Sequence, residues 1–296
     1  MSLIRSRLAH RSKIFRAISL SVAIGVFPFL ASCGLGSNDP PAATVYDETP
    51  FDPQNFVDPL VATNRWFPLT PGTQLITQGT TLIGNRKVPY EVIKTVTDVT
   101  RVIDGVKTLL VYDYETGVGQ VTQRSIDYFA QDVRGNLWIM GGATEAWEAG
   151  RYVEVDEVWM SGVDEAKAGI WMPADPTAST TPWIIDHQPD QVSVARFVRT
   201  QAMCVPFGCF PHVLVTFEGT KSGPNNELKY YALGLGQIRN EPRADSRHDD
   251  TELLINAIQL SHQGLAAASG DALQIDRRAA RAYPRFYGTV EARRAP

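Results

Sequence analysis

The sequence predicts a mainly β protein in which a single antiparallel sheet curves into a half-barrel or a barrel. Two observations indicate this class: short runs rich in Val, Ile, Thr and Tyr alternate with turn sequences, and signals for helices are scarce before residue 265. Runs of this kind that are joined by tight turns become antiparallel neighbours. We expect the sheet to occupy residues 64–262, which is enough chain for one sizeable core.

Three hairpins are expected in this region. The strongest signal is at residues 88–115, where VPYEVIKTVTDVTRV and VKTLLVYDYE flank Asp104-Gly105. Asp-Gly suits the left-handed turn that joins two antiparallel strands. A second hairpin pairs RSIDYFAQ with LWIMGG across residues 132–136, and a third pairs HVLVTFEG with ELKYYALG across residues 222–226.

The C-terminal segment, residues 263–296, is locally basic, with six arginines against three acidic residues. A short helix is expected at residues 271–282, with Ser269 or Asp271 as its N-cap and Pro284 as its stop. The segment either docks on the acidic body or forms a loose, solvated end. A loose end is the default expectation for a terminus.

The N-terminus carries an export signal. Its first sixteen residues hold only basic charges, on Arg5, Arg7, Arg11, Lys13 and Arg16. The apolar stretch 17–30 that follows is shorter than the roughly 20 residues that span a bilayer, as in a signal peptide. Leu30-Ala31-Ser32-Cys33 then matches the pattern of bacterial lipoprotein precursors, in which residues 1–32 are removed and the cysteine is acylated. We expect a lipid anchor on Cys33, with Gly34 favouring the outer membrane and its periplasmic face; ordinary cleavage that leaves a free thiol is the alternative.

Removal of the signal makes the chain strongly acidic. The whole sequence has 28 basic and 32 acidic residues, and loss of the five basic residues of the signal leaves 23 against 32, a net charge of −9. This balance argues against nucleic acid as a partner, because phosphate binding requires a basic surface. Membrane attachment is then left to the lipid. Residues 33–63, rich in proline, are expected to form an extended tether.

Cys204 and Cys209 are the two remaining cysteines. An exported protein meets an oxidising environment, in which two cysteines close in sequence are expected to form a disulfide. Pro206 and Gly208 suit the tight loop between them. Because the loop is short, the bond should contribute less than the roughly 3 kcal/mol of a 15-residue loop. A redox motif or a zinc site fits this spacing less well.

Four sets of short motifs resemble a family of uncharacterised bacterial secreted proteins and lipoproteins. They are Trp66-Phe67-Pro68-Leu69-Thr70-Pro71-Gly72-Thr73; Asp127-Tyr128-Phe129-Ala130-Gln131-Asp132 with Gly135-Asn136-Leu137-Trp138; Gly162-Val163-Asp164 with Gly169-Ile170 and Met172-Pro173-Ala174; and Tyr230-Tyr231-Ala232 with Gly234 and Gly236. The last has Leu233 where the family pattern has proline. The resemblance covers residues 65–240 and implies an exported protein with a β-sheet of the lipoprotein-carrier type. It implies no catalytic set, so no functional residue is carried over.

Signatures of the common enzyme classes are missing from the sequence: there is no Gly-x-Ser-x-Gly elbow, no His-Glu-x-x-His and no phosphate loop. We therefore expect neither a catalytic residue nor a cofactor, and no metal. Two alternatives stay open. The acidic residues between positions 145 and 165 could bind calcium, although a solvated sheet edge explains them too. A carboxylate pair of an envelope hydrolase could be drawn from Asp113, Glu115, Asp127, Glu148 and Glu154.

A long loop is expected at residues 159–183, carrying Trp159, Met160, Trp171, Met172 and Trp183. Loops of this length are often functional. The five side chains would either line an apolar pocket at the mouth of the sheet or complete the core. We expect a non-enzymatic, lipid-anchored envelope protein that binds an apolar or amphipathic, lipid-like ligand or an envelope protein partner through its curved sheet. A structural or assembly role is the remaining alternative.

Overall fold

The computed structural model describes residues 45–83, 86–221, 226–243, 250–288 and 291–295. The chain divides into two units, Met1–Val45 and Tyr46–Pro296, and every described helix and strand belongs to the second. Cys33 and the whole predicted signal peptide lie outside the described residues.

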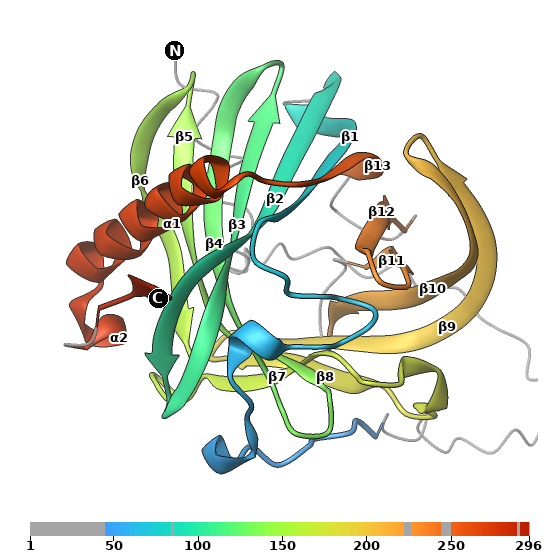
Figure 1. Cartoon of the computed structure of the whole chain (residues 1–296), viewed down its shortest axis with the longest axis horizontal. Helices are drawn as coiled ribbons and strands as arrows, with labels where there is room; N and C mark the ends of the chain where they lie inside the picture. Colours follow the sequence, from blue (N-terminus) through green and yellow to red (C-terminus); the bar gives the residue numbers. More distant parts are fainter. Residues whose placement is uncertain (1–44, 84–85, 222–225, 244–249, 289–290, 296) are drawn as a thin grey trace, which may run out of the picture. The chain divides into compact units, whose positions relative to one another are not determined.

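Fourteen strands and two α-helices make up the described structure (Figure 1). The strands are β1 (Thr73–Ile83), β2 (Arg86–Ile103), β3 (Val106–Gly117), β4 (Gln120–Gln131), β5 (Leu137–Glu148), β6 (Arg151–Met160), β7 (Lys167–Met172), β8 (Trp183–Gln188), β9 (Gln191–Val205), β10 (Gly208–Thr220), β11 (Glu227–Ala232), β12 (Gly236–Pro242), β13 (Thr251–Gln259) and β14 (Arg293–Arg294). The helices are α1 (His262–Ala282) and α2 (Pro284–Tyr287).

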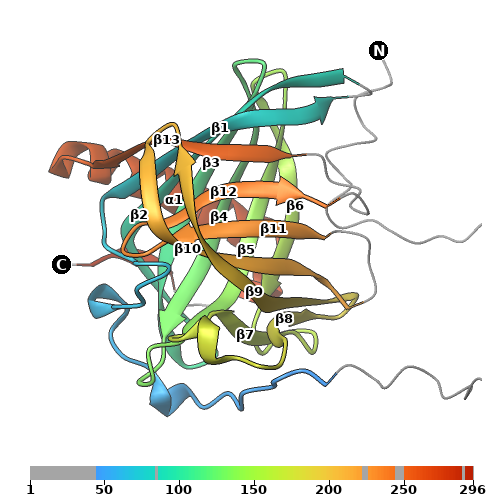
Figure 2. The ribbon, with the colours of Figure 1, turned by 90° about the vertical axis from the view of Figure 1, so that its right-hand side faces the viewer.

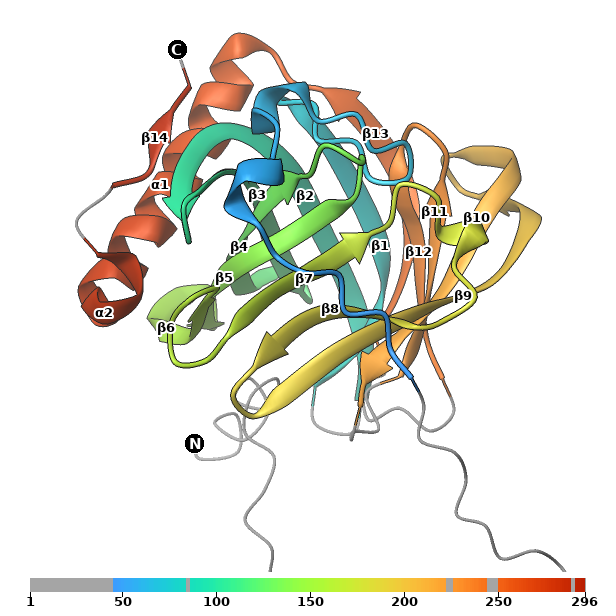
Figure 3. The ribbon, with the colours of Figure 1, turned by 90° about the horizontal axis from the view of Figure 1, so that it is seen from below.

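The sheet closes on itself. β1 pairs with β13 on one side and with β2 on the other, so twelve strands form a closed antiparallel barrel in the order β1-β13-β12-β11-β10-β9-β8-β7-β5-β4-β3-β2. β6 pairs with β5, and β14 pairs with β2, outside this ring. Figure 3 shows the strands wrapping around a common interior. The predicted class, a mainly β protein with a barrel-like antiparallel sheet, is confirmed.

The three predicted hairpins are β2–β3, β4–β5 and β10–β11. Asp104 and Gly105 join β2 to β3 with φ angles of 50° and 81°, the left-handed pair that such turns require. The Asp132 carboxylate organises the β4–β5 turn by accepting the backbone N–H groups of Arg134 and Asn136, each at 2.9 Å. The tip between β10 and β11, residues 222–225, lies outside the described residues.

The C-terminal helix is longer than expected. α1 begins at His262 rather than near residue 271, and the Ser261 hydroxyl caps it by accepting the Gly264 N–H at 3.2 Å. Buried Ala268, Ala272 and Ala279 let the helix lie close against β2 to β6 (Figure 1). The expectation of a loose C-terminal end is wrong for this segment, because its alanines and Ile275 form a buried contact surface against the barrel. Among the described residues, no helix is long and apolar enough to cross a membrane.

The second half of the predicted tether packs against the barrel. The rings of Phe51 and Phe56 lie 6.0 and 5.6 Å from that of Trp138, centroid to centroid. The N–H groups of Thr63 and Asn64 both donate to the side-chain oxygen of Gln131 at 2.7 Å. The folded unit therefore starts at Tyr46, because two phenylalanines among the prolines provide the apolar contacts that an extended tether would lack.

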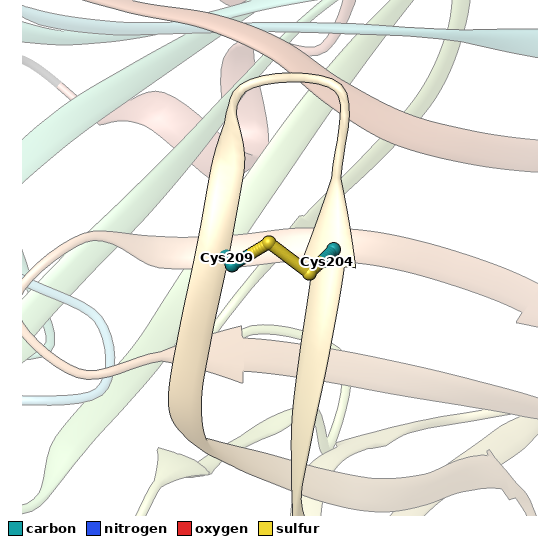
Figure 4. Close-up of a disulfide and its surroundings, with 2 residues drawn as sticks. All are labelled: Cys204 and Cys209. Carbon is teal, nitrogen blue, oxygen red and sulfur yellow. A yellow bond between two sulfur atoms is a disulfide. The ribbon is translucent and has the colours of Figure 1, made fainter.

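The disulfide between Cys204 and Cys209 is confirmed (Figure 4). The two cysteines are directly paired across β9 and β10, with their Cα atoms 4.0 Å apart. The hairpin that they join reaches across β11 and β12 towards β13 (Figure 2), where the Phe207 N–H donates to the Leu254 carbonyl at 3.1 Å. The bond thus holds the end of a long hairpin that folds back over the barrel wall.

Candidate functional site

The barrel wall has an outer face under α1 and an inner face with a different chemistry. Tyr128 donates its hydroxyl proton to Asp276 of α1 at 2.8 Å, whereas the next residue, Phe129, packs against Trp171 with centroids 5.6 Å apart. Successive residues of a strand point to opposite faces. Trp171 also lies 5.0 Å from Lys229 Nζ of β11. β4 and β11 are distant in the ring, yet Phe129 and Lys229 contact the same tryptophan. Both side chains therefore point into the interior of the barrel.

One part of the interior is an aromatic layer, defined by Phe67, Phe129 and Trp171. The ring centroid of Phe67 lies 5.5 Å from that of Phe129 and 6.1 Å from that of Trp171. Asn64 fixes the segment that carries Phe67, since its side-chain oxygen accepts the Phe67 N–H at 3.0 Å and its amide donates to the Met172 carbonyl at 3.2 Å. The predicted Trp66–Thr73 motif thus contributes to the packed base of the barrel.

Next to this layer the interior becomes strongly charged. On β4, Phe129 belongs to the aromatic layer, and Asp127, two residues away on the same face, is charged. Glu218 marks the same change on the opposite wall, where it accepts from the Tyr231 hydroxyl at 2.8 Å and contacts Lys229 Nζ at 2.9 Å. We call this group the acidic cluster. It consists of Lys94, Lys229, Asp113, Glu115, Asp127, Asp186, Glu218, Glu227 and Glu252.

Charge interactions link members of the cluster from strands around the whole ring. Lys94 of β2 contacts Asp113 of β3, with Nζ and Oδ2 2.5 Å apart, and it also feels the charges of Asp127 and Glu252. The charge of Asp127 in turn acts on Asp186 of β8. Seven carboxyl groups and two lysines of the described residues are thus linked around the ring.

This environment shifts the pKa of two carboxyls towards neutrality. Burial raises the pKa of Glu252 to about 7, and the nearby charges of Glu115 and Glu227 add to the effect against the hydrogen bond from Thr77. Burial likewise raises the pKa of Asp186 to about 6, with a further contribution from Asp127. Removal of a carboxylate from water and repulsion by like charges both favour its protonated form.

The lysines respond in the opposite way. Burial by itself would lower the pKa of Lys94, but the charges of Asp113, Asp127 and Glu252 outweigh it, so the pKa is raised. The pKa of Lys229 is also raised, because Glu218 and Glu227 outweigh its burial. Both lysines thus keep their positive charge. The carboxylates of the cluster outnumber them.

Solvent reaches part of the cluster. The side chains of Lys94, Asp113 and Lys229 are 22%, 13% and 14% exposed, although burial is the largest effect on the pKa values of both lysines. These side chains are therefore surrounded by protein and still accessible to water.

Two acceptor atoms in this region have no hydrogen-bond partner among the residues that the structure describes. Asn240 is 7% exposed, and its side-chain oxygen is unpaired; it lies on β12 directly opposite Glu252 on one side and Lys229 on the other, so it shares their face. The second atom is Asp113 Oδ1. A buried acceptor without a donor is costly, and such atoms are rare in native proteins.

The five residues predicted to bind ligand lie in or against the core. Trp159, Met160, Met172 and Trp183 are buried, and Trp171, a member of the aromatic layer, is partly buried. The long loop expected at residues 159–183 is interrupted by β7, whose alternating Ala168, Ile170 and Met172 carry the pattern of a strand. The indole N–H groups of Trp171 and Trp183 have no partner.

The carboxylates considered for a hydrolase divide into two groups. Asp113, Glu115 and Asp127 come together in the acidic cluster, whereas Glu148 lies near the end of β5 and Glu154 is exposed on β6. The most perturbed carboxyls, Asp186 and Glu252, were not expected from the sequence. One sequence feature could have indicated the acidic cluster: charged residues occupy positions within the predicted strands where apolar residues are expected.

The residues considered for calcium do not gather into one group. Glu145 is buried under α1, where Arg278 Nη1 lies 3.1 Å from its Oε1. Within the described ranges, no group of three or more His, Cys, Asp or Glu side chains is arranged to hold a metal ion. A surface pocket beside β14 includes Arg101, Lys107 and Arg293, but Arg101 and Lys107 already have the carboxylate partners Asp276 and Asp58.

The sequence matches no family model and no curated protein. Two crystal structures show a remote likeness. One, provisionally described as a lipoprotein from Parabacteroides distasonis, is 10% identical, with a TM-score of 0.33 over 66% of this chain and 99% of its own. The other, provisionally described as an exported protein with a YmcC-like fold from Bacteroides fragilis, is 11% identical, with a TM-score of 0.35 over 66% of this chain and 100% of its own.

Proposed function

We propose that this protein is exported, anchored in the cell envelope by lipid on Cys33, and acts as a binding module through the interior of its barrel. The anchor is supported by the basic N-terminus, the short apolar stretch and Leu30-Ala31-Ser32-Cys33. More than one acyl chain on the cysteine makes such an anchor stable, since each buried methylene contributes about 0.8 kcal/mol. Gly34 and the resemblance to exported bacterial proteins favour the periplasmic face of the outer membrane.

One observation carries the binding proposal: an aromatic layer and an acidic cluster lie side by side in the interior, and Trp171 touches both. Its ring centroid lies 5.6 Å from that of Phe129 and 5.0 Å from Lys229 Nζ. An interior that changes from apolar to charged within one side chain suits an amphipathic ligand. Partly accessible charged groups and unpaired polar atoms are characteristic of binding sites rather than of a closed core.

The anchor is tested by Cys33→Ser. We expect the variant to accumulate as unprocessed or soluble protein, whereas the wild type fractionates with the membrane and carries acyl chains detectable by mass spectrometry. Acylated membrane protein from the Cys33→Ser variant would overturn the anchor.

Ligand binding is tested by native mass spectrometry on residues 34–296, exported without the cysteine and purified gently. These residues contain the complete Tyr46–Pro296 unit. We expect a discrete added mass that disappears on denaturation. A bare protein mass under conditions that preserve a known weak complex would count against a binding module and favour an assembly role.

A second candidate function, an envelope hydrolase, is favoured by the raised pKa of Asp186, to which the charge of Asp127 contributes. A carboxyl with a pKa of about 6 beside another carboxylate is an arrangement that can supply a general acid and a base. Hydrolysis of ester, glycoside or amide substrates by the purified protein, lost in both Asp127→Asn and Asp186→Asn, would support it. If the wild type were no more active than the two variants, the hydrolase would be excluded.

A further inference from the structure

We infer that the barrel wall opens between β12 and β13, and that ionisation of Glu252 controls the opening. The closed wall holds Glu252 in its protonated form, and the open wall exposes it to water as a carboxylate. The inference goes beyond the proposed function, because it concerns the wall itself and requires no ligand.

The junction of β12 with β13, which we call the seam, is one of the two shortest in the ring. Two residue pairs join these strands among the described residues, Arg239 with Leu253 and Asn240 with Glu252. By contrast, β13 pairs with β1 through eight residues, and β12 pairs with β11 through six. A junction with few backbone pairs is the part of a closed sheet that opens most readily.

The β9–β10 hairpin crosses the outside of the seam (Figure 2). Near its tip, the Phe207 N–H donates to the carbonyl of Leu254 on β13 at 3.1 Å. Val205 of the hairpin belongs to the same buried apolar cluster as Leu254 and Ile238 of β12. The hairpin is therefore a strap that connects the two sides of the seam.

The pair at the inner face of the seam depends on a proton. Glu252 lies directly opposite Asn240, whose side-chain oxygen has no donor among the described residues. On the other side of Asn240, Lys229 is already bound to Glu218 and Glu227. Directly paired residues have Cβ atoms about 4.5–5.5 Å apart, so a protonated Glu252 can donate to the oxygen of Asn240. An ionised Glu252 has no proton to donate and sets its own acceptors against that oxygen.

The surroundings of Glu252 favour its protonated form while the wall is closed. Burial raises its pKa from 4.5 to about 7, and the charges of Glu115 on β3 and Glu227 on β11 add to the rise, against the hydrogen bond from Thr77 and the charge of Lys94. Once the wall opens, water solvates the carboxylate and the pKa returns towards 4.5. The closed wall thus binds the proton more tightly, and opening becomes more favourable as pH rises from about 4.5 through about 7.

Hydrogen–deuterium exchange of residues 34–296, measured by mass spectrometry without added ligand, tests the inference. The wild type is compared with Glu252→Gln, which cannot ionise, at about pH 5.5 and about pH 8.5, and comparison at one pH cancels the chemical effect of pH on exchange. We expect similar exchange of β12 and β13 at the lower pH and faster exchange in the wild type at the higher pH. The opening equilibrium of the wild type should rise roughly thirtyfold over this range, given pKa values of 4.5 and about 7.

Two further variants provide controls. Asp186→Asn removes the carboxyl, with a pKa raised by burial to about 6, at the other junction with two pairs, where Ala168 of β7 lies opposite Asp186 of β8. It should keep the wild-type pH dependence of exchange in β12 and β13. Arg239→Cys with Leu253→Cys places a disulfide across the seam. This variant should lose the faster exchange at high pH although Glu252 is still present.

Equal exchange of β12 and β13 in the wild type and Glu252→Gln at the higher pH would overturn the inference. So would exchange that rises in these strands only together with β2, β3 and β4, because that pattern indicates global unfolding rather than a local opening. If Glu252→Gln did not fold, the crosslinked variant would take its place, with the same two contradicting results. Since no ligand is added, a bare mass in native mass spectrometry would remove the binding module and leave this inference standing.

Discussion

Buried charges lie on both faces of the same barrel wall, and they are arranged in contrasting ways. On the outer face, Arg101 Nε and Asp276 Oδ1 are 2.8 Å apart with both side chains 3% exposed, and Arg278 of α1 contacts the buried Glu145. Each cation there has one carboxylate. On the inner face, the acidic cluster sets seven carboxylates against two lysines.

The outer pairs also satisfy their hydrogen bonds. Arg101 donates twice to Asp276 and once to the Tyr287 carbonyl, and Tyr128 donates to the same carboxylate. On the inner face, the oxygen of Asn240 and Asp113 Oδ1 stay unpaired. The Arg101–Asp276 and Arg278–Glu145 pairs hold α1 on the barrel. Atoms without a partner among the described residues lie on both faces, since Arg124 Nε and the Tyr112 hydroxyl of the outer face are unpaired too, so the faces differ in their ratio of carboxylates to cations. The comparison distinguishes a structural use of buried charge from a binding use.

The largest expected effect comes from breaking an outer pair. Asp276→Ala leaves the Arg101 guanidinium buried without its carboxylate, and we expect a loss of about 3–5 kcal/mol in the free energy of unfolding. Urea unfolding followed by tryptophan fluorescence measures it. The double variant Arg101→Met with Asp276→Leu should recover most of the loss, because it removes both charges. A single variant as stable as the wild type would contradict a structural role for this pair.

The inner face should respond in the opposite direction. The pKa of Glu252 is raised from 4.5 to about 7, so the folded state binds the extra proton, and the contribution of Glu252 to stability falls as pH rises from about 4.5 through about 7. Glu252→Gln does not titrate. Relative to the wild type it should gain stability across this window, by up to roughly 3 kcal/mol at pH 8. Parallel stability curves of the two proteins against pH would show that Glu252 is not in such an environment.

A smaller effect is expected at the hairpin tip, which belongs to neither set of charges. Replacing Cys204 and Cys209 by serine should lower the free energy of unfolding by about 2 kcal/mol, the entropy that closure of a short loop provides. Ligand occupancy in native mass spectrometry should stay unchanged, because the bond lies between β9 and β10 outside the acidic cluster. Loss of affinity in this variant would show that the folded-back hairpin shapes the interior.

The smallest effect is expected for an exposed ion pair. Lys107 and Asp58 are 43% and 50% exposed, with Nζ and Oδ2 2.9 Å apart. Lys107→Gln should change the free energy of unfolding by less than about 1 kcal/mol, since water screens such pairs. A larger loss of unfolding free energy in the same urea assay would mean that burial does not determine which ion pairs stabilise the protein strongly.

Local sequence was sufficient for the features that depend on neighbouring residues. Asp104-Gly105 predicts its own turn, and the short spacing of Cys204 and Cys209 predicts their bond. Features that depend on packing were missed. The Ala- and Gly-rich start of α1 carries no strong periodicity, and Phe51 and Phe56 show their role only against Trp138.

The acidic cluster was missed for a different reason. The sequence identifies Asp113, Glu115 and Asp127 as candidate carboxylates. Their relation to Asp186 and Glu252 depends on closure of the ring, which brings β2, β4, β8 and β13 around one interior. Sequence alone does not determine the register of twelve strands. It therefore does not tell which charged residues of a strand face inward, because a shift of one residue reverses the faces.

Native mass spectrometry of the wild type beside Glu252→Gln, both as residues 34–296 and purified in the same way, tests the central claim most directly. We expect a discrete bound mass on the wild type that is released by denaturation and is strongly reduced on the variant. Equal occupancy of the two proteins would contradict this claim.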